Sequence, residues 1–419
     1  MKRTNLCLSI IPLAAAAVLV TPAAGQDTPL ELSGELRVRS QRERGIVGTR
    51  AEGATLLRTR LRLHAPVTPY ASVVIQFQDS RVFGEESNTL TDGSANQMDL
   101  HQAYLRLTAS VLGLSVTVTA GRQEVVLGSE RLVGAVGWSN TGRSFDALRL
   151  FLEPEEDRWV LSALAATIVE RGRMAPEPDP SAAPGLGDHT LLGVSLDAGS
   201  LQGLLLHDLN AAYRDAEDVD RTTISGQWEG AVGWGPRYAL EGAYQFGTQL
   251  RATSSEDIGA WFVGGRLGWI RTLGPLESIE LGVDWLSGDD DPSDGRYSAF
   301  NTLYATNHKF YGFMDLFLDP AAQTNDRGLI DGLVTLTLQR DPLPLRATVH
   351  RFWLASSDGV DQSEIGWEFD LTVPFEVGDA GTALVGYSAF RAGGGAQEAN
   401  LGYSGSYRHW AFAQLGISF

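Results

Sequence analysis

The sequence predicts an all-β protein, an 18-stranded antiparallel β-barrel that crosses a membrane. Three observations carry this prediction. Segments in which apolar and polar residues alternate with a period of two recur from end to end. The connections between these segments alternate between short and long, and no segment keeps a helical period over three turns. A period of two is typical of strands, whose successive side chains point to opposite faces.

The stretch 56–64 shows this period most clearly. Its basic residues share one phase, and apolar residues dominate the other: Arg58, Arg60, Arg62 and His64 against Leu57, Thr59, Leu61 and Leu63. Arginine on the lipid face of a barrel costs about 2–4 kcal/mol near the midplane. The basic phase is therefore expected to face an aqueous lumen, with the leucines in lipid.

Eighteen such segments follow one another along the chain. The expected strands are 31–42, 54–65, 69–82, 97–109, 113–125, 143–153, 158–170, 188–198, 201–213, 221–233, 237–250, 258–272, 276–287, 328–340, 344–356, 362–376, 381–392 and 407–419. Ser144–Leu152 and Leu112–Arg122 change phase midway, which predicts bulges there.

The connections after odd-numbered segments are long and polar, and the others are tight, such as 66–68, 235–236 and 341–343. An even strand count with short turns at one end and long loops at the other is typical of bacterial outer-membrane barrels. We therefore expect short periplasmic turns and long extracellular loops. A soluble sandwich would need buried cores and fewer charges on the second phase.

Both ends of the chain agree with this location. Lys2 and Arg3 precede an apolar run from about Leu6 to Val20 and small residues before Gln26, the pattern of a secretory signal peptide at 1–25. The single barrel domain would then be 26–419. The last strand ends on Phe419, with Leu415 and Ile417 in the same phase.

Composition limits the function classes. The formal net charge of −18 argues against nucleic-acid binding. The only cysteine, Cys7, lies in the signal peptide, which excludes disulfides from the mature chain. Lys2 and Lys309 are the only lysines, so nearly every cation is arginine, the better bidentate partner for carboxylates and phosphates.

The first two strands carry the candidate solute-binding residues. Arg37, Arg39, Arg58, Arg60 and Arg62 form an arginine strip on the expected lumen side. One interpretation is a surface that attracts anions; the alternative is a barrel wall whose arginines pair with neighbouring acids for stability. Other candidates of the lumen phase are Arg106, Glu368 and Asp370.

Four blocks resemble the alginate export family of outer-membrane porins. They are Gly121-Arg122-Gln123 with Arg131-Leu132-Val133-Gly134, Trp138 and Phe145-Asp146; the run from Phe300 to Gly312 with Met314-Asp315; Gly328-Leu329-Ile330-Asp331; and Gly366-Trp367-Glu368-Phe369-Asp370 with Gly386 to Phe390. The resemblance implies a monomeric 18-stranded barrel whose arginine-rich constriction passes an anionic polyuronate, and it adds Arg122 to the candidate lumen residues. Acids in the lumen phase, such as Glu35 and Asp284, predict a wall of mixed charge.

The connection 288–327 is far longer than the others. Loops of that length are usually functional or disordered, and its aromatic residues predict that it folds into the barrel mouth. The candidates for narrowing the pore are Asn301, Tyr304, Asn307, His308, Lys309, Tyr311 and Asp315. An extracellular cap or a flexible loop is the alternative.

Other chemistry has less support in the sequence. Asp289, Asp291 and Asp294 are calcium candidates through hard oxygen ligands, and no other cofactor is expected. No catalytic, nucleotide-binding or transition-metal motif is present, so we expect no enzyme.

The predicted function is passive passage of an anionic saccharide or related anionic solute through the outer membrane. The alternatives are a general uptake porin and a plugged barrel that acts as a surface receptor or scaffold. Expected partners are outer-membrane lipid, the anionic saccharide or small anionic solute, and a periplasmic export protein.

Overall fold

The computed structural model describes residues 30–45, 52–83, 98–155, 158–169, 189–210, 218–233, 235–251, 254–339, 344–402 and 407–419. The expected signal peptide at 1–25 lies outside these ranges. Within them, eighteen strands form a closed antiparallel barrel, which confirms the predicted fold class. No helix among the described residues is long and apolar enough to cross a membrane.

The wall strands follow the predicted order, and their bounds differ from the predicted ones by a few residues. They are β1 (Glu31–Gly45), β2 (Glu52–Thr68), β3 (Ala71–Phe83), β4 (Asp99–Val111), β5 (Leu114–Gln123), β6 (Phe145–Pro154), β7 (Val160–Val169), β8 (His189–Ala198), β9 (Leu201–Asn210), β10 (Val219–Ala231), β11 (Pro236–Arg251), β12 (Ser254–Leu273), β13 (Leu276–Leu286), β15 (Leu329–Leu338), β16 (Leu345–Leu354), β17 (Glu364–Val377), β18 (Gly381–Ala392) and β19 (Tyr407–Ser418). Between them lie β14 (Arg296–Tyr297), which pairs parallel with β12, and the short helices η1 (Asn307–Lys309), α1 (Pro320–Gln323) and α2 (Gly394–Glu398).

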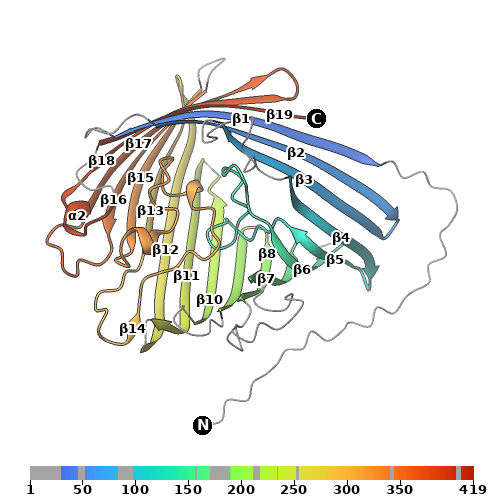
Figure 1. Cartoon of the computed structure of the whole chain (residues 1–419), viewed down its shortest axis with the longest axis horizontal. Coiled ribbons are helices and arrows are strands. Elements are labelled where there is room, and N and C mark those ends of the chain that lie inside the picture. The colour runs from blue at the N-terminus through green and yellow to red at the C-terminus, as the bar shows by residue number, and fades with distance from the viewer. Residues whose placement is uncertain are drawn as a thin grey trace, which may run out of the picture.

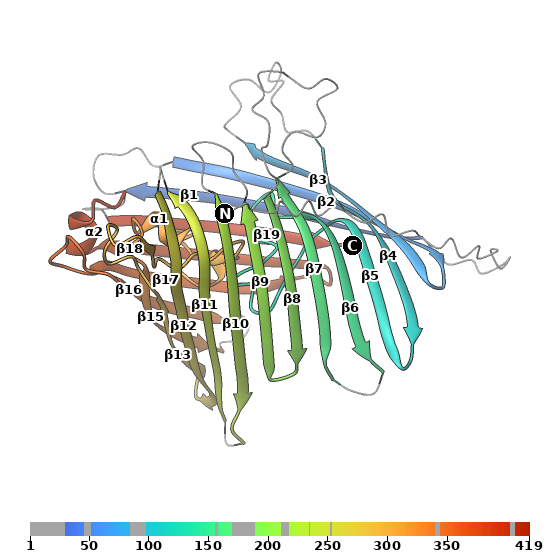
Figure 2. The same ribbon diagram turned by 90° about the horizontal axis from the view of Figure 1, so that it is seen from below.

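The barrel closes between its first and last strands. Strand β1 pairs antiparallel with both β2 and β19, and Gly34 exchanges backbone hydrogen bonds with Phe419. Figure 1 shows β1 and β19 side by side, and Figure 2 shows the hairpins β4–β5, β8–β9 and β10–β11 turning at the same end. That end is the short-turn, periplasmic end.

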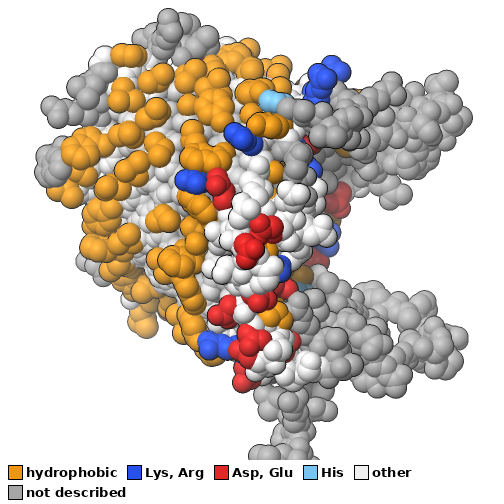
Figure 3. Space-filling view, turned by 90° about the vertical axis from the view of Figure 1, so that its left-hand side faces the viewer, with side chains coloured by type: hydrophobic (Ala, Val, Ile, Leu, Met, Phe, Trp, Pro, Cys, Tyr) orange, Lys and Arg blue, Asp and Glu red, His pale blue; other side chains and the backbone are white. Residues whose placement is uncertain are grey.

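The outer face is hydrophobic, as a lipid-facing wall requires. Leu36, Leu61, Leu281, Val283 and Val385 are each about two-fifths to one-half exposed, although they are apolar and lie in mid-strand. Figure 3 shows such side chains covering the barrel wall. Their partners in the other phase point into the lumen, and the predicted phase of β1 and β2 is confirmed: Arg37 and Arg58 are buried.

The bulges expected in 112–122 and 144–152 are wrong, because β5 pairs with β4 and β6 without a register shift. Strand β6 instead carries apolar residues on both faces, with Leu148 outside and Phe145 and Ala147 inside. The inner ones pack in a buried cluster with Val125 and Leu132 of the connection that precedes β6. The connection 124–144, which folds inward, therefore takes the place of water along the inner face of β6. The inner residues of β6 are apolar for this reason, and the alternation of apolar and polar residues is lost.

The tight turn expected at Pro66-Val67-Thr68 is also shifted. These residues continue β2, where Pro66 lies opposite Ser72, and the chain turns at Pro69-Tyr70. A register shift between Pro66 and Thr68 accommodates the proline, which has no N–H to donate to the ladder.

The fold generates a first prediction. Leu281→Arg places a cation in the middle of the outer face of β13 and should lower the free energy of unfolding by about 2–4 kcal/mol. Urea titration of the barrel in lipid vesicles measures this loss. Glu280→Arg, one residue away on the lumen face, is the matched control. An equal loss in both variants would contradict the assignment of faces.

Candidate functional site

Two long connections fold into the barrel and meet there. One joins β5 to β6 (residues 124–144) and the other joins β13 to β15 (residues 287–328); we call them the lumen segments (Figure 1). They pair through backbone hydrogen bonds from Gly134 to Tyr304 (2.9 Å) and from Tyr304 to Leu132 (2.8 Å). The Arg143 guanidinium also donates to the Tyr304 carbonyl. The connection 288–327 therefore folds into the barrel as expected. It contacts a second inward segment, residues 124–144, which was not expected from the sequence.

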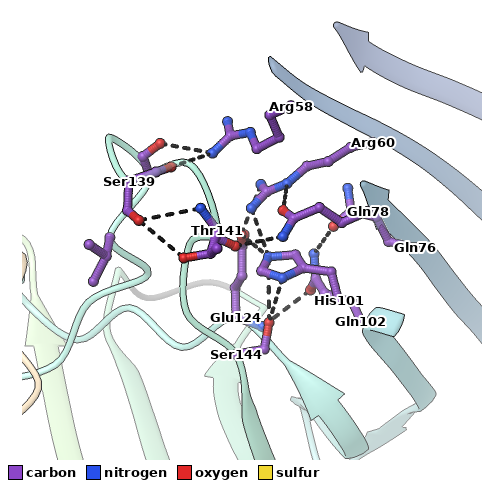
Figure 4. Close-up of polar contacts among 12 residues, drawn as sticks. Arg58, Arg60, Gln76, Gln78, His101, Gln102, Glu124, Ser139, Thr141 and Ser144 are labelled. Atoms are coloured by element: carbon purple, nitrogen blue, oxygen red, sulfur yellow. Dashed lines mark hydrogen bonds and ion pairs between the residues drawn. The ribbon is translucent and has the colours of Figure 1, made fainter. Parts of the chain in front are cut away.

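The arginine strip holds the first lumen segment. Arg37 donates to the carbonyls of Gly137 and Ser139, both at 2.7 Å. Arg58 donates to the same two carbonyls at 3.0 Å, and Figure 4 shows Arg58 beside Ser139. Arg39 donates to the carbonyl of Trp138 at 3.0 Å. A loop turn left without ladder partners must satisfy its carbonyls elsewhere, and these guanidinium groups supply the donors.

A second anchor forms around Arg60. Its guanidinium contacts Gln78 (2.6 Å), His101 (2.9 Å) and Glu124 (3.1 Å), as Figure 4 shows. His101 also lies 2.8 Å from Glu124. Between β3 and β4 the register shifts, so that Phe77 opposes Leu100 while Gln76 opposes Gln102. The extra residue is His101, and this bulge lets its side chain bury toward Arg60.

These contacts leave the strip with surplus positive charge. Arg58 pairs with Glu35 at 2.6 Å and Arg60 with Glu124, but Arg37 and Arg39 bond to neutral carbonyls. Burial alone would raise the pKa of Glu124, but hydrogen bonds and charges from His101 and Arg60 lower it. Glu124 is therefore ionised at neutral pH. The four strip arginines Arg37, Arg39, Arg58 and Arg60 are only 5–8% exposed, so they act on the lumen mainly through their field.

Arg131 anchors the same segment on the opposite wall. Its guanidinium contacts Glu241 at 3.0 Å and Asp284 at 2.9 Å, and Arg266 makes a bidentate pair with Asp284 at 2.7 and 2.8 Å. Burial would lower the pKa of Arg131, but the charge of Asp284 raises it. The hydroxyl of Tyr311 accepts from Arg131 at 3.2 Å, which ties the second lumen segment to this network.

The second lumen segment is held by other wall residues. Tyr304 donates to Asp208 at 2.8 Å, with His189 at 2.7 Å from its hydroxyl. The amide of Met314 donates to Glu368 at 2.9 Å. Asn301 exchanges hydrogen bonds of 2.8 and 3.0 Å with Gln245.

An aromatic contact joins the two segments near the strip. Trp138 stacks on His308, with ring centroids 4.4 Å apart, and the guanidinium of Arg39 lies 4.3 Å from the Trp138 ring centroid. His308 also contacts Asp315 at 2.5 Å.

A cavity of about 670 Å³ lies on the short-turn side of the lumen segments. Lys309 and Phe310 of the second lumen segment line it, and the wall near the β15–β16 turn contributes Thr335 and Arg346. Its lining also includes the carboxylates of Glu130, Glu280 and Asp370. Lys309 remains about half exposed, with Glu130 at 3.2 Å. Arg346 is exposed toward this space. These two cations, unlike the buried Arg37, Arg39, Arg58 and Arg60 of the strip, are open to a solute.

More arginines face the same half of the lumen. Arg106 lies in register with the buried Thr119, which lies in register with Arg149, so all three side chains point inward. Arg62 is half-buried and only 3.4 Å from the hydroxyl of Tyr104. Of the predicted lumen residues, Arg62 and Arg106 are therefore placed where a solute can reach them.

Three predicted lumen residues are placed elsewhere. Arg122 points outward, because it lies in register with Asp146, next to the inward Ala147; the two make a bidentate ion pair at 2.8 Å. Glu368 and Asp370 do point inward, but they are buried behind residues 312–314 and only 0–2% exposed. Arg122 and Glu368 are thus removed from the set that a solute could contact, whereas Asp370, although only 2% exposed, still lines the cavity.

Most predicted pore-narrowing residues hold the segment in place. Asn307 is buried and donates to Thr302 and to the Leu318 carbonyl, while Asn301, Tyr304 and Tyr311 bond to the wall or Arg131. Lys309 alone is both charged and largely exposed within this set. Sequence analysis assigned no role to His101, Glu130 or Arg143; only the bulge and the pairing of the two segments give them one.

The calcium candidates do not converge. Asp289 is buried and accepts from Ser298, Asp291 accepts from Ser293, and Asp294 accepts from the Arg296 amide. Within the described ranges no group of three or more His, Cys, Asp or Glu side chains is placed to hold a metal ion. These aspartates cap the turns of their own loop instead.

Comparison with known proteins decides the family. The alginate export family model matches residues 28–409. The chain belongs to the alginate export family. Comparison with curated protein sequences gave no match.

Solved porins share the fold of this alginate export family barrel at low identity. OccK11 (OpdR) of Pseudomonas aeruginosa is 11% identical, with a TM-score of 0.56 over 93% of this chain and 96% of that one. OccAB1 of Acinetobacter baumannii is 13% identical, with a TM-score of 0.57 over 93% and 97%. OccK2 (OpdF) of P. aeruginosa, solved with glucuronate, is 10% identical, with a TM-score of 0.56 over 93% and 96%. At these identities the likeness shows the fold alone.

The Arg131 network generates a second prediction. Arg131→Ala leaves the buried Glu241 without its cation and Asp284 with Arg266 alone, and it should lower the free energy of unfolding by about 3–5 kcal/mol. Urea titration measures it, with the exposed Lys309→Ala as the control. Adding Glu241→Gln should restore part of the loss, and a double variant as unstable as Arg131→Ala would refute the electrostatic cause.

The strip generates a third prediction. Arg37→Ala with Arg58→Ala removes both sets of donors to Gly137 and Ser139, so the first lumen segment should detach from the wall. Hydrogen exchange of peptides covering 135–142 should accelerate while exchange in β1 and β2 stays slow. Arg62→Ala, on the same strand but without these contacts, should leave 135–142 protected. Unchanged exchange in the double variant would show that the arginines do not hold the segment.

Proposed function

We propose that this outer-membrane channel passes an anionic saccharide or related anionic solute by passive diffusion. The observation that carries the proposal is the charge of the lumen on the short-turn side. Arg62, Arg106 and Arg346 face it from different walls, and Lys309 faces it from the second lumen segment. Glu130 offsets part of the charge of Lys309, and Glu280 lines the same space. Charged groups in a narrow, low-dielectric passage concentrate ions of the opposite sign.

The buried strip supports the same proposal from the constriction itself. A cation bonded to carbonyl oxygens keeps its full charge, whereas one paired with a carboxylate is largely neutralised at a distance. Arg37 and Arg39 belong to the first kind. The anion would pass a positive field without being held by a direct contact, which favours rapid release.

The chemistry of a saccharide carboxylate fits these side chains. Arginine binds carboxylates through parallel hydrogen bonds, and hydroxyl groups such as Thr335 and Thr348 line the same cavity for sugar contacts. A fold neighbour, OccK2 (OpdF), was solved in complex with glucuronate, and the family is an alginate export family. Both are consistent with a uronate-like solute.

The second candidate is a plugged barrel that serves as a receptor or scaffold. The observation in its favour is the buried hydrophobic cluster that packs the lumen segments against β6–β9. A general uptake porin is the third candidate. The family and the fold neighbours are channels and porins rather than enzymes; we propose that this chain is a non-catalytic monomer, secreted by a cleaved signal peptide and supplied by a periplasmic partner.

The decisive experiment is conductance in planar bilayers under a salt gradient. The proposal expects an anion-selective reversal potential and current block by uronic acid oligomers, but not by neutral oligosaccharides of equal length. Conductance without preference would favour the general porin, and no conductance the plugged barrel. A cation-selective channel would refute the proposal.

A variant pair forms the fourth prediction. Lys309→Gln with Arg346→Gln removes two cations that are open to solute and should lower the anion-to-cation permeability ratio several-fold with little change in stability. Arg122→Gln removes a cation of the outer face and is the matched control. Equal ratios in the Lys309/Arg346 variant and the control would place selectivity elsewhere.

A further inference from the structure

Outward-facing cations gather in one sector of the barrel at its long-loop end. Register pairs Arg351 of β16 with Trp367 of β17, Trp367 with Arg391 of β18, and Arg391 with Tyr407 of β19. Residues paired across a sheet share a face, and Trp367 and Tyr407 are 43% and 44% exposed on the outside. The four side chains therefore form one row along the outer wall, alternating cation and ring.

The neighbouring strand β1 extends this row. Arg44 lies in register with His409, and Arg42 with Ala411, on the face opposite the buried Trp410 and Phe412. The hydroxyl of Tyr387 lies 2.6 Å from His409 and completes the ring layer. We define the outer cationic patch as Arg42, Arg44, Arg351, Arg391, Trp367, Tyr407 and His409. Figure 3 shows cationic side chains on this side of the molecule where the hydrophobic wall meets the polar rim.

Two guanidinium groups of the patch, those of Arg351 and Arg391, lie over aromatic rings, and of these two only Arg351 also has a carboxylate partner. Arg351 lies 4.6 Å from the Trp367 ring centroid and 4.8 Å from that of Trp353; its carboxylate partner is Glu364 at 3.2 Å. Arg391 lies 5.6 Å from the Tyr407 ring centroid. Within the described residues, Arg42, Arg44 and Arg391 have no carboxylate within salt-bridge distance.

Other outward arginines of the same rim show the contrast. Arg122 pairs with Asp146 and Arg81 with Asp79, each at 2.8 Å. These two cations at strand ends are paired within the protein, whereas Arg42, Arg44 and Arg391 of the patch keep their charge near the aromatic rings that mark the membrane interface. At the membrane interface the available anions are lipid phosphates, and a guanidinium group binds a phosphate through two parallel hydrogen bonds.

We propose that the outer cationic patch binds the phosphate groups of a lipid in the extracellular leaflet. The backbones of Arg351 and Arg391 are two strands apart, about 10 Å at the usual strand spacing, so both guanidinium groups can reach one headgroup lying over Trp367. Arg44 and Arg42 can reach a second phosphate of the same or a neighbouring lipid. The inference concerns the outer wall and is independent of the solute in the lumen.

The test uses the purified full-length mature barrel in detergent, with lipid A as the probe in its bis-phosphorylated and enzymatically dephosphorylated forms. Native mass spectrometry counts lipid that stays bound. The wild type should retain the phosphorylated form at least about tenfold better, since a lost charged hydrogen-bond pair is worth a factor of that order. Arg44→Gln with Arg391→Gln should abolish this preference, while Arg122→Gln should keep it.

Folding of every variant is checked by its heat-modifiable mobility on gels, which separates loss of binding from loss of the barrel. Equal retention of both lipid forms by the wild type, or an unchanged preference in the Arg44/Arg391 variant, would overturn the proposal. In a further measurement, inorganic phosphate is added as a competitor of the phosphorylated lipid. If it displaces the phosphorylated lipid completely at millimolar concentration, the patch binds free phosphate and the lipid assignment is wrong.

Discussion

The contacts between buried guanidinium groups and loop carbonyls are what the interior of this barrel depends on. Residues 137–141 lie in the lumen without a strand partner, and their carbonyl oxygens need donors there. Arg37, Arg39 and Arg58 provide them for residues 137–139, and Ser80 and Gln78 provide them for Asn140 and Thr141. Because the first lumen segment pairs with the second through Tyr304, the same arginines also fix the position of residues 300–311, and with them the cavity on the periplasmic side.

Arginine is suited to this role for a physical reason. A guanidinium has five donors in a rigid fork and keeps its charge even when it is buried, so Arg58 can serve Glu35 and two carbonyls at once. A barrel wall that used carboxylate–arginine pairs alone would have no donors left for the loop. The choice between a solute-binding strip and a structural wall is therefore not exclusive: the strip is structural by its contacts and electrostatic by its remaining charge.

The sequence predicted the wall far better than its contents. Strand order, strand number and the inward phase of Arg37 and Arg58 follow from local rules, since a period of two and the cost of charge in lipid act on each strand separately. The interior follows from contacts between distant segments. Nothing in the sequence near Val125 or Phe145 indicates that these residues pack together inside a barrel. For this reason the apolar inner face of β6 looked like a change of phase within 144–152.

Single-residue shifts explain the remaining differences. One extra residue in β4 turns His101 toward Arg60, and a regular β5 sends Arg122 outward to Asp146. Bulges cannot be located from alternation alone, because one inserted residue and one exception to the pattern look the same in a sequence. Arg122 sits in a block that matches the family, so membership of that block did not determine which face the side chain takes.

Arginine side chains thus occupy three environments in this protein, and the contact partner determines what each one does. Buried against carbonyls, as at Arg37, it orders a segment and contributes a field. Facing the cavity, as at Arg346, it is open to an anion in the lumen. Stacked on a ring at the outer rim, as at Arg391, it is directed at the membrane interface.

A chain with one lysine beyond residue 25 and an overall net charge of −18 is acidic only on average. Its arginines stand where a planar, permanently charged donor is needed, and many of its carboxylates, such as Asp284 and Glu368, are buried as acceptors for the lumen segments. The positive lumen that we propose consequently depends on which charges remain exposed, and the net charge of the sequence does not report it.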